Sequence, residues 1–400
     1  MDKSRRNFLK KIALSYIYSD FVFKHFFLDK KSFLAFAEDK KDLEVLNDRP
    51  LNAQAEPHKL DQQVTPTHSL FVRNNGIVPS AAYQSDLSKW SLSVTGELNQ
   101  EKSYTMKDLL KKFKLYTYQL VLECGGNGRA GFYPPTPGNQ WTYGAVGCPE
   151  WSGIRLKDLL NDLGLKSSAK YIAYYGMDIH PSGDMKKDVI SRGFPIHKAL
   201  EDTTLVAFKL NGKDLPPVHG FPARLICPGF PASASGKWLK KIWVRDRVHD
   251  GAKMTGNSYK IPKNPVAPGS KVLDKDLMII ENMPVKSLIT FPRSKSKVAV
   301  KDKDKFICRG FAWSGSGEIA KVDVSFDFGQ TWHTAKLSQP ANPFAWQRWE
   351  ITLVLPQQGY YEVWSCATDM TGKSQPMVTP GWNPKGYVNN AMPRIAINVV

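Results

Sequence analysis

Short runs of alternating hydrophobic and polar residues dominate the middle of the chain. Four of these runs have the composition and period of β-strands: residues 90–96 (WSLSVTG), 116–123 (YTYQLVLE), 171–175 and 204–210. Two further runs, residues 105–113 and 154–163, have helical spacing, and Thr105 is a candidate N-cap for the first of them. Strands and helices interleaved in this way predict an α+β domain.

The pattern changes after residues 261–270 (IPKNPVAPGS), where three prolines and a glycine predict a linker. Beyond it, short strand-like runs are separated by turn residues: 298–300, 305–312, 319–326, 346–354 and 360–367. Such spacing predicts an immunoglobulin-like β-sandwich. Residues 38–85 are polar and predicted to form loops. We therefore predict a mixed α/β domain over 38–265 and a sandwich over 266–400.

The N-terminal segment has the features of an export signal. Residues 4–10 (SRRNFLK) match a twin-arginine motif, a moderately apolar stretch follows over 12–27, and residues 35–37 (AFA) form a small-residue cleavage site. We predict a signal peptide over 1–37 and a periplasmic protein that is exported already folded. Its mature chain would begin near Glu38, in an oxidising compartment.

The formal net charge of +18 indicates partners that carry negative charge. A basic surface can attract nucleic acid, anionic substrates or an acidic protein. Because the lysines are scattered and no zinc-finger spacing, RNP-type run or basic helix is present, small anions or an acidic electron-transfer partner are favoured over nucleic acid. No stretch approaches the roughly 18–20 apolar residues that span a bilayer, so no membrane span is expected.

The five cysteines include no C-x-x-C pair, which argues against zinc ribbons, iron–sulfur runs and covalent haem attachment. Any haem is therefore expected on another chain. Cys308 and Cys366 lie in two predicted sandwich strands, with Trp332 between them in the sequence. This is roughly the Cys…Trp…Cys order of immunoglobulin-type sandwiches, and it suggests a Cys308–Cys366 disulfide as a hypothesis.

The central chemical feature is residues 122–129 (LECGGNGR), where a predicted strand ends at Cys124 and passes into a glycine-rich turn that ends in Arg129. Glycines allow a tight turn and close approach to a ligand. A nearby arginine favours the thiolate, which is the form that binds metal, and the remaining metal ligands would come from a cofactor. Two alternatives remain open. Cys124 could be a buried structural cysteine, or a nucleophile with His180, His197 or His219 as its base.

This segment resembles the C-[AGS]-G-N-x-R segment of the sulfite oxidase family, whose cysteine ligates molybdenum. Further segments similar to that family follow in the same order: 71–75 (FVRNN), 139–141 (NQW), 150–153 (EWSG), 211–216 (NGKDLP), 219–224 (HGFPAR), 228–229 with 237–239 (PG, KWL), 310–315 (GFAWSG), 327–332 (DFGQTW) and 382–390 (WNPKGYVNN). The resemblance covers residues 68–400. It implies a molybdopterin-binding domain followed by a sandwich that makes a homodimer.

The resemblance also implies a role for individual residues. Cys124 would be the one protein ligand of molybdenum, and Arg73 would serve both the cofactor and the catalytic centre. Arg129, Trp141 and Lys385 would lie on the substrate side. The further cofactor-binding candidates are Phe71, Asn74, Asn75, Asp178, Thr203, His219, Arg224, Ser235, Gly236 and Lys237.

Two positions depart from the family pattern. Lys385 stands where vertebrate members have an arginine, which keeps the charge but loses the bidentate fork. The loop over 228–235 (PGFPASAS) lacks the second glycine and the tyrosine that are usual there. Both departures concern the substrate. Sulfite is favoured, and a protein-bound sulfane or thiosulfonate group comes next.

The resemblance implies oxidation of sulfite to sulfate by oxygen-atom transfer, with electrons passed to a separate c-type cytochrome. An alternative within the family is the sulfane dehydrogenase subunit of a sulfur-oxidising complex. An alternative of another class is a non-catalytic exported binding module in which Cys124 is structural. A thiol hydrolase is a further possibility, although the sequence places no histidine beside Cys124.

Overall fold

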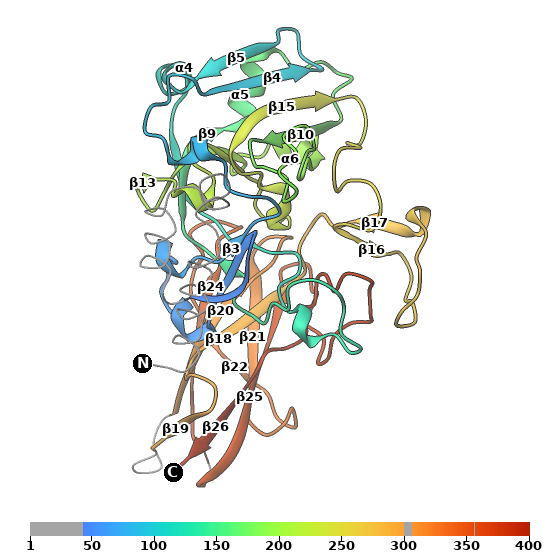
Figure 1. Cartoon of the computed structure of the whole chain (residues 1–400). Helices are drawn as coiled ribbons and strands as arrows, with labels where there is room; N and C mark the ends of the chain where they lie inside the picture. The colour runs from blue at the N-terminus through green and yellow to red at the C-terminus, as the bar shows by residue number, and fades with distance from the viewer. Residues whose placement is uncertain (1–42, 300–305, 356) are drawn as a thin grey trace, which may run out of the picture. The chain divides into compact units, whose positions relative to one another are not determined.

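Figure 1 shows the computed structural model, which describes residues 43–299, 306–355 and 357–400. The predicted signal peptide and its cleavage site lie outside the described residues. Within the described part, no helix is long and apolar enough to cross a membrane.

The first domain contains two five-stranded sheets. One sheet has the order β11-β10-β15-β4-β5, in which β15 runs parallel to β4 and the other neighbours are antiparallel. Its strands are β4 (Ser91–Gly96), β5 (Lys102–Thr105), β10 (Tyr171–Gly176), β11 (Gly193–Pro195) and β15 (Leu239–Arg245).

The second sheet has the order β13-β12-β9-β6, with β14 also paired to β12. Its strands are β6 (Tyr116–Gln119), β9 (Glu150–Arg155), β12 (Leu205–Leu210), β13 (Lys213–Asp214) and β14 (Arg224–Ile226). Three α-helices accompany the two sheets: α4 (Met106–Lys112), α5 (Leu156–Leu163) and α6 (Ile196–Ala199).

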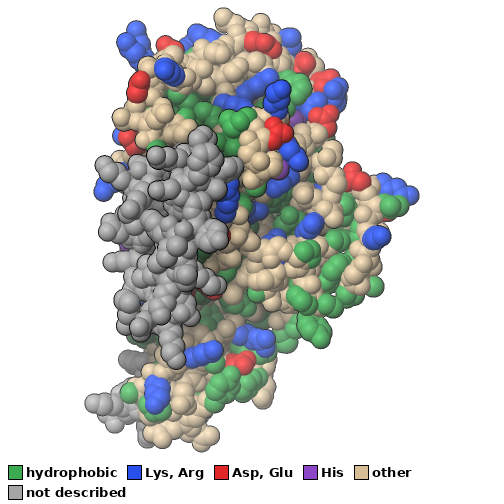
Figure 2. All heavy atoms as spheres, in the orientation of Figure 1, with side chains coloured by type: hydrophobic (Ala, Val, Ile, Leu, Met, Phe, Trp, Pro, Cys, Tyr) green, Lys and Arg blue, Asp and Glu red, His purple; other side chains and the backbone are tan. Residues whose placement is uncertain are grey.

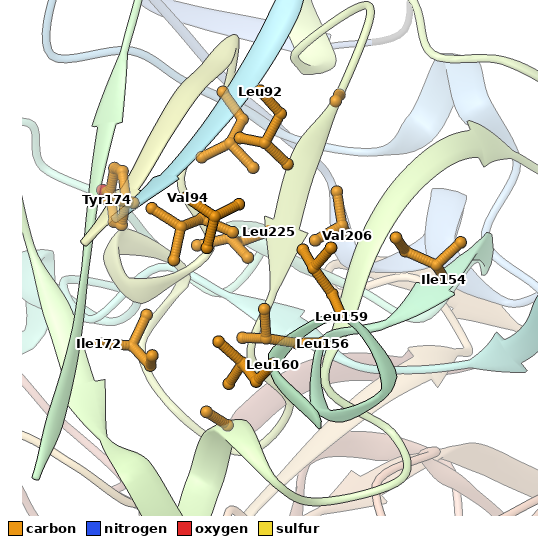
Figure 3. Packing of buried hydrophobic residues seen from close by; sticks show 14 of the residues in the cluster. Leu92, Val94, Ile154, Leu156, Leu159, Leu160, Ile172, Tyr174, Val206 and Leu225 are labelled. Carbon is orange, nitrogen blue, oxygen red and sulfur yellow. The ribbon is translucent and has the colours of Figure 1, made fainter. Parts of the chain in front are cut away.

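One hydrophobic cluster joins both sheets to α5 (Figure 3). The helix buries Leu156, Leu159, Leu160 and Leu163, whose spacing places them on one face. Truncating such a leucine to alanine costs about 2–5 kcal/mol. The sheets contribute Leu92, Val94, Ile154, Ile172, Val206 and Leu225. This core fixes the strands whose ends carry the site described below.

Local signals predict α4 well. The Thr105 hydroxyl accepts a hydrogen bond from the Asp108 amide at 3.2 Å, and the Asp108 carboxylate accepts one from the Thr105 amide at 2.9 Å. This capping box satisfies two donors at the start of the helix. The prediction of a helix that begins at Ile154 was wrong, because Ile154 pairs with Val206 in β9 and the helix begins at Leu156.

The single strand predicted over 116–123 is two strands. β6 pairs with β9, whereas β7 (Leu122–Glu123) pairs with β8 (Val146–Gly147). Between them the Val121 amide donates to the Phe344 carbonyl at 3.0 Å, so this point of the chain is attached to the second domain. The change of partner brings Cys124 towards the second domain.

The loop prediction for residues 38–85 was wrong in part, because β1 (Leu43–Asp48), β2 (Leu51–Ala55) and β3 (Val72–Arg73) form a sheet. Most of residues 56–71 and 74–85 lies in 3₁₀ turns and irregular segments, as predicted. Asn52 and Gln54 can be buried because their side chains are hydrogen-bonded, Asn52 to the Asn74 amide at 2.9 Å and Gln54 to Glu44 at 2.8 Å.

The described residues also contain short 3₁₀ turns, at Pro57–Leu60, Thr67–Ser69, Ser80–Tyr83, Arg129–Gly131, Pro217–His219, Ala232–Ala234 and Asp274–Asp276.

The second domain is the predicted sandwich. One sheet has the order β18-β20-β24-β23 and the other β19-β26-β25-β21-β22. The strands are β18 (Lys286–Phe291), β19 (Ser296–Val298), β20 (Phe306–Trp313), β21 (Ile319–Ser325), β22 (His333–Thr334), β23 (Lys336–Leu337), β24 (Gln347–Leu353), β25 (Gly359–Asp369) and β26 (Arg394–Val399). The predicted linker begins within β16 (Lys260–Pro262), which pairs with β17 (Leu277–Ile279).

The predicted Cys308–Cys366 disulfide is wrong in this structure, where both are free thiols. Cys308 lies in the sandwich core on β20, but β25 turns Val363 and Ala367 towards that core and Cys366 away from it. Side chains two apart share a face of a strand, so the position of Val363 excludes its odd-spaced neighbour Cys366 from the core. The Cys366 thiol instead contacts the Gln375 carbonyl at 3.6 Å.

Candidate active site

The turn that follows β7 presents Cys124. The Cys124 amide donates to the Ala145 carbonyl at 2.9 Å, and the Asn127 amide donates to the Cys124 carbonyl at 2.8 Å. Gly128 has φ +90°, a left-handed conformation that glycine adopts without strain. The chain therefore leaves β7 by a tight turn, and Arg129 begins the 3₁₀ turn that follows it. Cys124 itself is buried, with 5% of its surface exposed.

Cys124 lies at the wall of a partly open cavity. The cavity brings together most of the cofactor-binding residues that the sequence predicts. Those that line it are Phe71, Arg73, Asn75, Cys124, Asp178, His219, Arg224, Ser235, Gly236 and Lys237. Residues that the sequence did not single out also line it, among them Tyr174, Ser233, Trp238 and Tyr259.

Two buried cations of the cavity have only uncharged hydrogen-bond partners among the described residues. Arg224 donates to the carbonyls of His219 at 2.9 Å and Ser235 at 3.1 Å. Lys237 donates to the Val218 carbonyl at 2.8 Å and to the Asn74 side chain. Burial lowers the pKa of Arg224 to about 9. Burial, reinforced by the charge of Arg224, lowers the pKa of Lys237 well below its usual value.

Asp178 of the same lining acts on Lys237 and opposes the lowering of its pKa, but neither Lys237 nor Arg224 forms an ion pair with a carboxylate among the described residues. Burying a charge without a directly paired counter-ion is costly, so these two cations indicate a site for an anion. The guanidinium of Arg matches phosphate oxygens in a bidentate fork, and Lys supplies a point charge beside it. The predicted Asn74 is not part of the lining, but it accepts from Lys237, and its buried Nδ2 is a further unused donor without a partner within the described residues. The donors of the cavity therefore fit a phosphorylated cofactor.

A second group surrounds Asn75 at the same cavity. The Asn75 Oδ1 atom accepts from Arg73 at 2.9 Å and from Lys253 at 2.6 Å, and Asn75 Nδ2 donates to the Tyr259 hydroxyl at 3.2 Å. Burial alone would raise the pKa of Tyr259, but the charges of Arg73 and Lys253 oppose it and leave the pKa below its usual value. Burial raises the pKa of Asp178 to about 6, against the lowering effect of nearby lysines.

Sequence reasoning missed Lys253 and Tyr259. Both follow β15 in a segment without a periodic pattern, and both have left-handed backbones, with φ +67° and +54°. Trp238, which also lines the cavity, has φ +51°. Non-glycine residues adopt this conformation at a cost, and such strain clusters at functional sites. A sequence without an alignment carries no signal for it.

The three residues predicted on the substrate side lie next to the cavity rather than in its lining. Arg129 is buried, and its guanidinium donates to the carbonyls of Lys385 at 2.8 Å and Asn139 at 2.9 Å. Trp141 is fully buried against Phe71, with ring centroids 6.4 Å apart, and its Nε1 has no partner within the described residues. Lys385 is half-buried. The fold thus joins Arg129 to the 382–390 segment of the second domain.

Some predicted positions fall outside the cavity. Thr203 lies in the turn between α6 and β12, beside Asp202, which pairs with Arg155 at 3.3 Å near the surface. This turn is separated from the lining, so the structure does not support Thr203 as a cofactor contact. Of the three histidines considered as a base for Cys124, His219 lines the cavity, whereas His180 and His197 do not.

Comparison with known proteins agrees with this geometry. The sequence matches the family described as oxidoreductase molybdopterin binding domain over residues 77–253, and the Mo-co oxidoreductase dimerisation domain over residues 277–400. It is 30% identical over 364 residues to the sulfite oxidase of Gallus gallus, an alignment that covers 88% of this chain and 77% of that protein. The chain belongs to the sulfite oxidase family.

The chain is also similar to a nitrate reductase and to a sulfane dehydrogenase. The chain is 30% identical over 357 residues to the nitrate reductase [NADH] of Solanum lycopersicum, of which it covers 38%. The sulfane dehydrogenase SoxCD from Paracoccus pantotrophus has a similar structure, with a TM-score of 0.72 and 26% identity, over 95% of this chain and 94% of that one. The chain is a molybdenum-cofactor oxidoreductase, so the alternatives of a non-catalytic binding module and a thiol hydrolase are wrong.

Within this family, the fit of the site is specific. Cys124 is the one cysteine in the cavity lining, and Cys148 and Cys227 are buried away from it. Burial raises the pKa of Cys148 to about 12, and it raises that of Cys227 beyond the ordinary range as well. Both thiols would stay protonated at neutral pH, which disfavours metal binding. Cys124 is therefore the candidate protein ligand of molybdenum.

Proposed function

We propose that this chain oxidises sulfite to sulfate with a molybdenum–pterin cofactor held beside Cys124. The observation that carries the proposal is the set of buried cations at the cavity, whose hydrogen bonds go to uncharged oxygens only. Relatives named sulfite oxidase share the family and about the whole length of this chain. The bound cofactor would supply oxygen-atom transfer, which residues of the chain alone cannot perform.

The protein's own contribution begins with holding the cofactor. Arg224 and Lys237, with His219, would grip its phosphate, and the bound anion would restore the protonated form that burial disfavours in Lys237. The Cys124 thiolate would bind the metal at the end of β7. Arg224 lies in β14, His219 in the 3₁₀ turn Pro217–His219 and Lys237 just before β15, so the first domain alone would supply most cofactor contacts.

Substrate binding would draw on the cations next to the cavity. Arg129, Lys253 and Lys385 create a positive field that favours a small oxyanion. On the face shown in Figure 2, Lys and Arg side chains recur over both domains with Asp and Glu among them, so charge on this face forms no single stripe of the kind that tracks nucleic acid. The oxyanion class thus suits the local charge.

Two electrons leave the site after each turnover, and we propose a separate c-type cytochrome as their acceptor. The test is reduction of ferricytochrome c by the purified, molybdenum-loaded full chain. We expect reduction that depends on sulfite and saturates with it. Molybdenum-loaded protein that fails to reduce ferricytochrome c with sulfite, and also fails with ferricyanide as acceptor, would overturn sulfite as the substrate.

A second candidate is a sulfane dehydrogenase subunit. It is favoured by the structural likeness to SoxCD from Paracoccus pantotrophus and by Lys385, which replaces the bidentate fork expected for sulfite. Turnover with a sulfane-bearing thiosulfonate protein conjugate, without turnover on sulfite, would favour this candidate over the first.

We further propose a homodimer formed through residues 277–400, as the description of that domain suggests. Location in the periplasm remains a proposal as well, supported by the twin-arginine motif of residues 4–10. Fractionation of cells that express the chain with both arginines replaced by lysine tests it, because the mutant protein should stay in the cytoplasm.

A further inference from the structure

A buried carboxylate immediately precedes Cys124. Glu123 has 2% of its surface exposed and accepts three side-chain hydrogen bonds. Its Oε1 atom accepts from Asn127 Nδ2 at 3.0 Å and from Lys286 Nζ at 2.6 Å, and its Oε2 atom accepts from Trp313 Nε1 at 2.9 Å. Glu123 is therefore held by its own turn on one side and by the second domain on the other.

Both partners from the second domain belong to one sheet. Lys286 opens β18, Trp313 closes β20, and the two residues are directly paired in the ladder. Lys286 Nζ also donates to the Asn127 carbonyl at 3.2 Å, so one ammonium group contacts both the carboxylate before Cys124 and the backbone after it. The side chain of Lys286 is only 6% exposed.

The same contacts continue to the backbone of Cys124. Asn127 Oδ1 accepts from the Ala145 amide at 3.1 Å, and the Ala145 carbonyl accepts from the Cys124 amide at 2.9 Å. A continuous chain of hydrogen bonds thus runs from the β18–β20 sheet to both ends of the turn that presents the thiol. Such a network has one low-energy arrangement, because every member must be satisfied at once.

A buried ion pair adds little net stability compared with an apolar contact of the same shape, whereas removing one partner is costly. Holding two domains together therefore does not require this pair. We propose that Lys286 is a positioning residue for the Cys124 turn. The second domain, beyond the dimerisation named for its family, orders the turn that presents the metal-binding thiol. This inference rests on the proposed function only for the role of Cys124 as the ligand.

The test uses the full chain produced without cofactor, so that Cys124 is not occupied by metal. Native protein is treated with iodoacetamide, and alkylation of each cysteine is followed by peptide mass spectrometry. In Lys286→Met, we expect Cys124 to react about tenfold faster or more than in wild type, because opening of the turn becomes easier. Cys148 and Cys308, buried elsewhere, should keep their wild-type rates.

A matched control is available on the same two strands. Asp61 accepts from Thr290 on β18 at 2.6 Å and from Arg309 on β20 at 2.7 Å, far along the sequence from Cys124. Asp61→Asn removes a charge that contacts the same sheet away from the Cys124 turn, so it should leave Cys124 alkylation unchanged. Equal acceleration of all buried cysteines in Lys286→Met, or no acceleration of Cys124, would overturn the proposal.

Lys286→Met leaves Glu123 buried and unpaired, which can prevent folding. The double substitution Glu123→Gln with Lys286→Met removes both charges and avoids that cost. We expect the double variant to fold, to alkylate faster at Cys124 and to retain less molybdenum per chain when produced with cofactor, while Lys286→Arg stays near wild type in both measurements. A double variant with wild-type alkylation and wild-type molybdenum content would contradict the positioning role, whether or not the enzyme oxidises sulfite.

Discussion

The rings of Tyr259 and Tyr387 stack with centroids 5.4 Å apart and planes inclined by 15°. Tyr259 precedes β16, and Tyr387 belongs to the 382–390 segment after β25. Burial raises the pKa of Tyr387 to about 12. A negative charge on Cys124 would raise the pKa of both Tyr387 and Tyr259. The stack therefore joins Tyr259 of the cavity lining to the 382–390 segment of the second domain.

Removing the Tyr259 hydroxyl should lower turnover without loss of cofactor. Tyr259→Phe keeps the stacked ring but loses the hydrogen bond with Asn75, so Lys253 and Arg73 lose a neighbour that orders them. We expect kcat/KM for sulfite to fall about threefold to tenfold, because a lost neutral hydrogen bond corresponds to about 0.5–1.5 kcal/mol. The measurements are steady-state kinetics and the molybdenum content of the purified Tyr259→Phe protein. Tyr360→Phe, at an exposed position, is the control. Unchanged kcat/KM would rule out the role of the hydroxyl.

Arg224 should control cofactor retention. Arg224→Lys keeps the charge but loses the fork that reaches the His219 and Ser235 carbonyls and the phosphate together. A lost charge-assisted hydrogen bond corresponds to about 1.5–3 kcal/mol, or about tenfold to a hundredfold in affinity. We expect purified protein with much less molybdenum and pterin per chain but a near-normal far-UV spectrum. Full occupancy after extensive dialysis would contradict the assignment of the phosphate site.

The sequence predicted features that depend on near neighbours or on a dense motif. Thr105 is predictable as an N-cap because it stands at the start of a run with helical spacing, and the structure shows its partner Asp108 only three residues away. Cys124, Arg224 and Lys237 were found through their segments, and the cavity brings them together. The pairing of Ile154 with Val206 was missed, because strand partners distant in sequence leave no trace in local periodicity.

The same limit explains the part of the site that was missed. Lys253 reaches Asn75 across 178 positions, and although Asn75 belongs to the 71–75 segment, no motif marks Lys253. The Glu123–Lys286 pair likewise joins two domains over 163 positions. The polar residues of strands β1 and β2 predict a loop, because burial of Asn52 and Gln54 depends on hydrogen-bond partners that only the fold supplies. Pattern reasoning finds apolar faces, and it does not find satisfied polar ones.

His249 should make the protein less stable in mild acid. Its Nε2 is 2.8 Å from Ser191 Oγ and its Nδ1 is 2.8 Å from Arg245, and burial with the charge of Arg245 lowers its pKa to about 4. The unfolded chain binds a proton below about pH 6.5, and the folded chain does so only near pH 4. Stability from this group is present above pH 6.5 and is lost as the pH falls towards 4.

The loss is at most of the order of 3 kcal/mol, since each pKa unit corresponds to about 1.36 kcal/mol. Urea unfolding at pH 7.5 and pH 4.5 measures it, and His249→Gln should show a smaller difference between the two pH values than wild type. The exposed His333→Gln serves as control. Equal pH dependence in wild type and His249→Gln would refute the assignment.

Lys385 should weaken sulfite recognition relative to an arginine at the same position. In Lys385→Arg, a bidentate guanidinium replaces a single ammonium, so an oxyanion gains a second hydrogen bond. We expect KM for sulfite to fall about tenfold with little change in kcat. A rise in KM instead would show that the site is shaped for a larger sulfur group, in agreement with the sulfane candidate.

The most direct test of the account is metal analysis of Cys124→Ser beside wild type, each combined with a sulfite-dependent cytochrome assay. We predict about one molybdenum per wild-type chain. The Cys124→Ser protein should keep its fold, lose its visible sulfur-to-metal absorption and show no turnover. A Cys124→Ser protein that turns over like wild type, or a fully folded wild-type chain produced with cofactor that contains no molybdenum, would contradict the account.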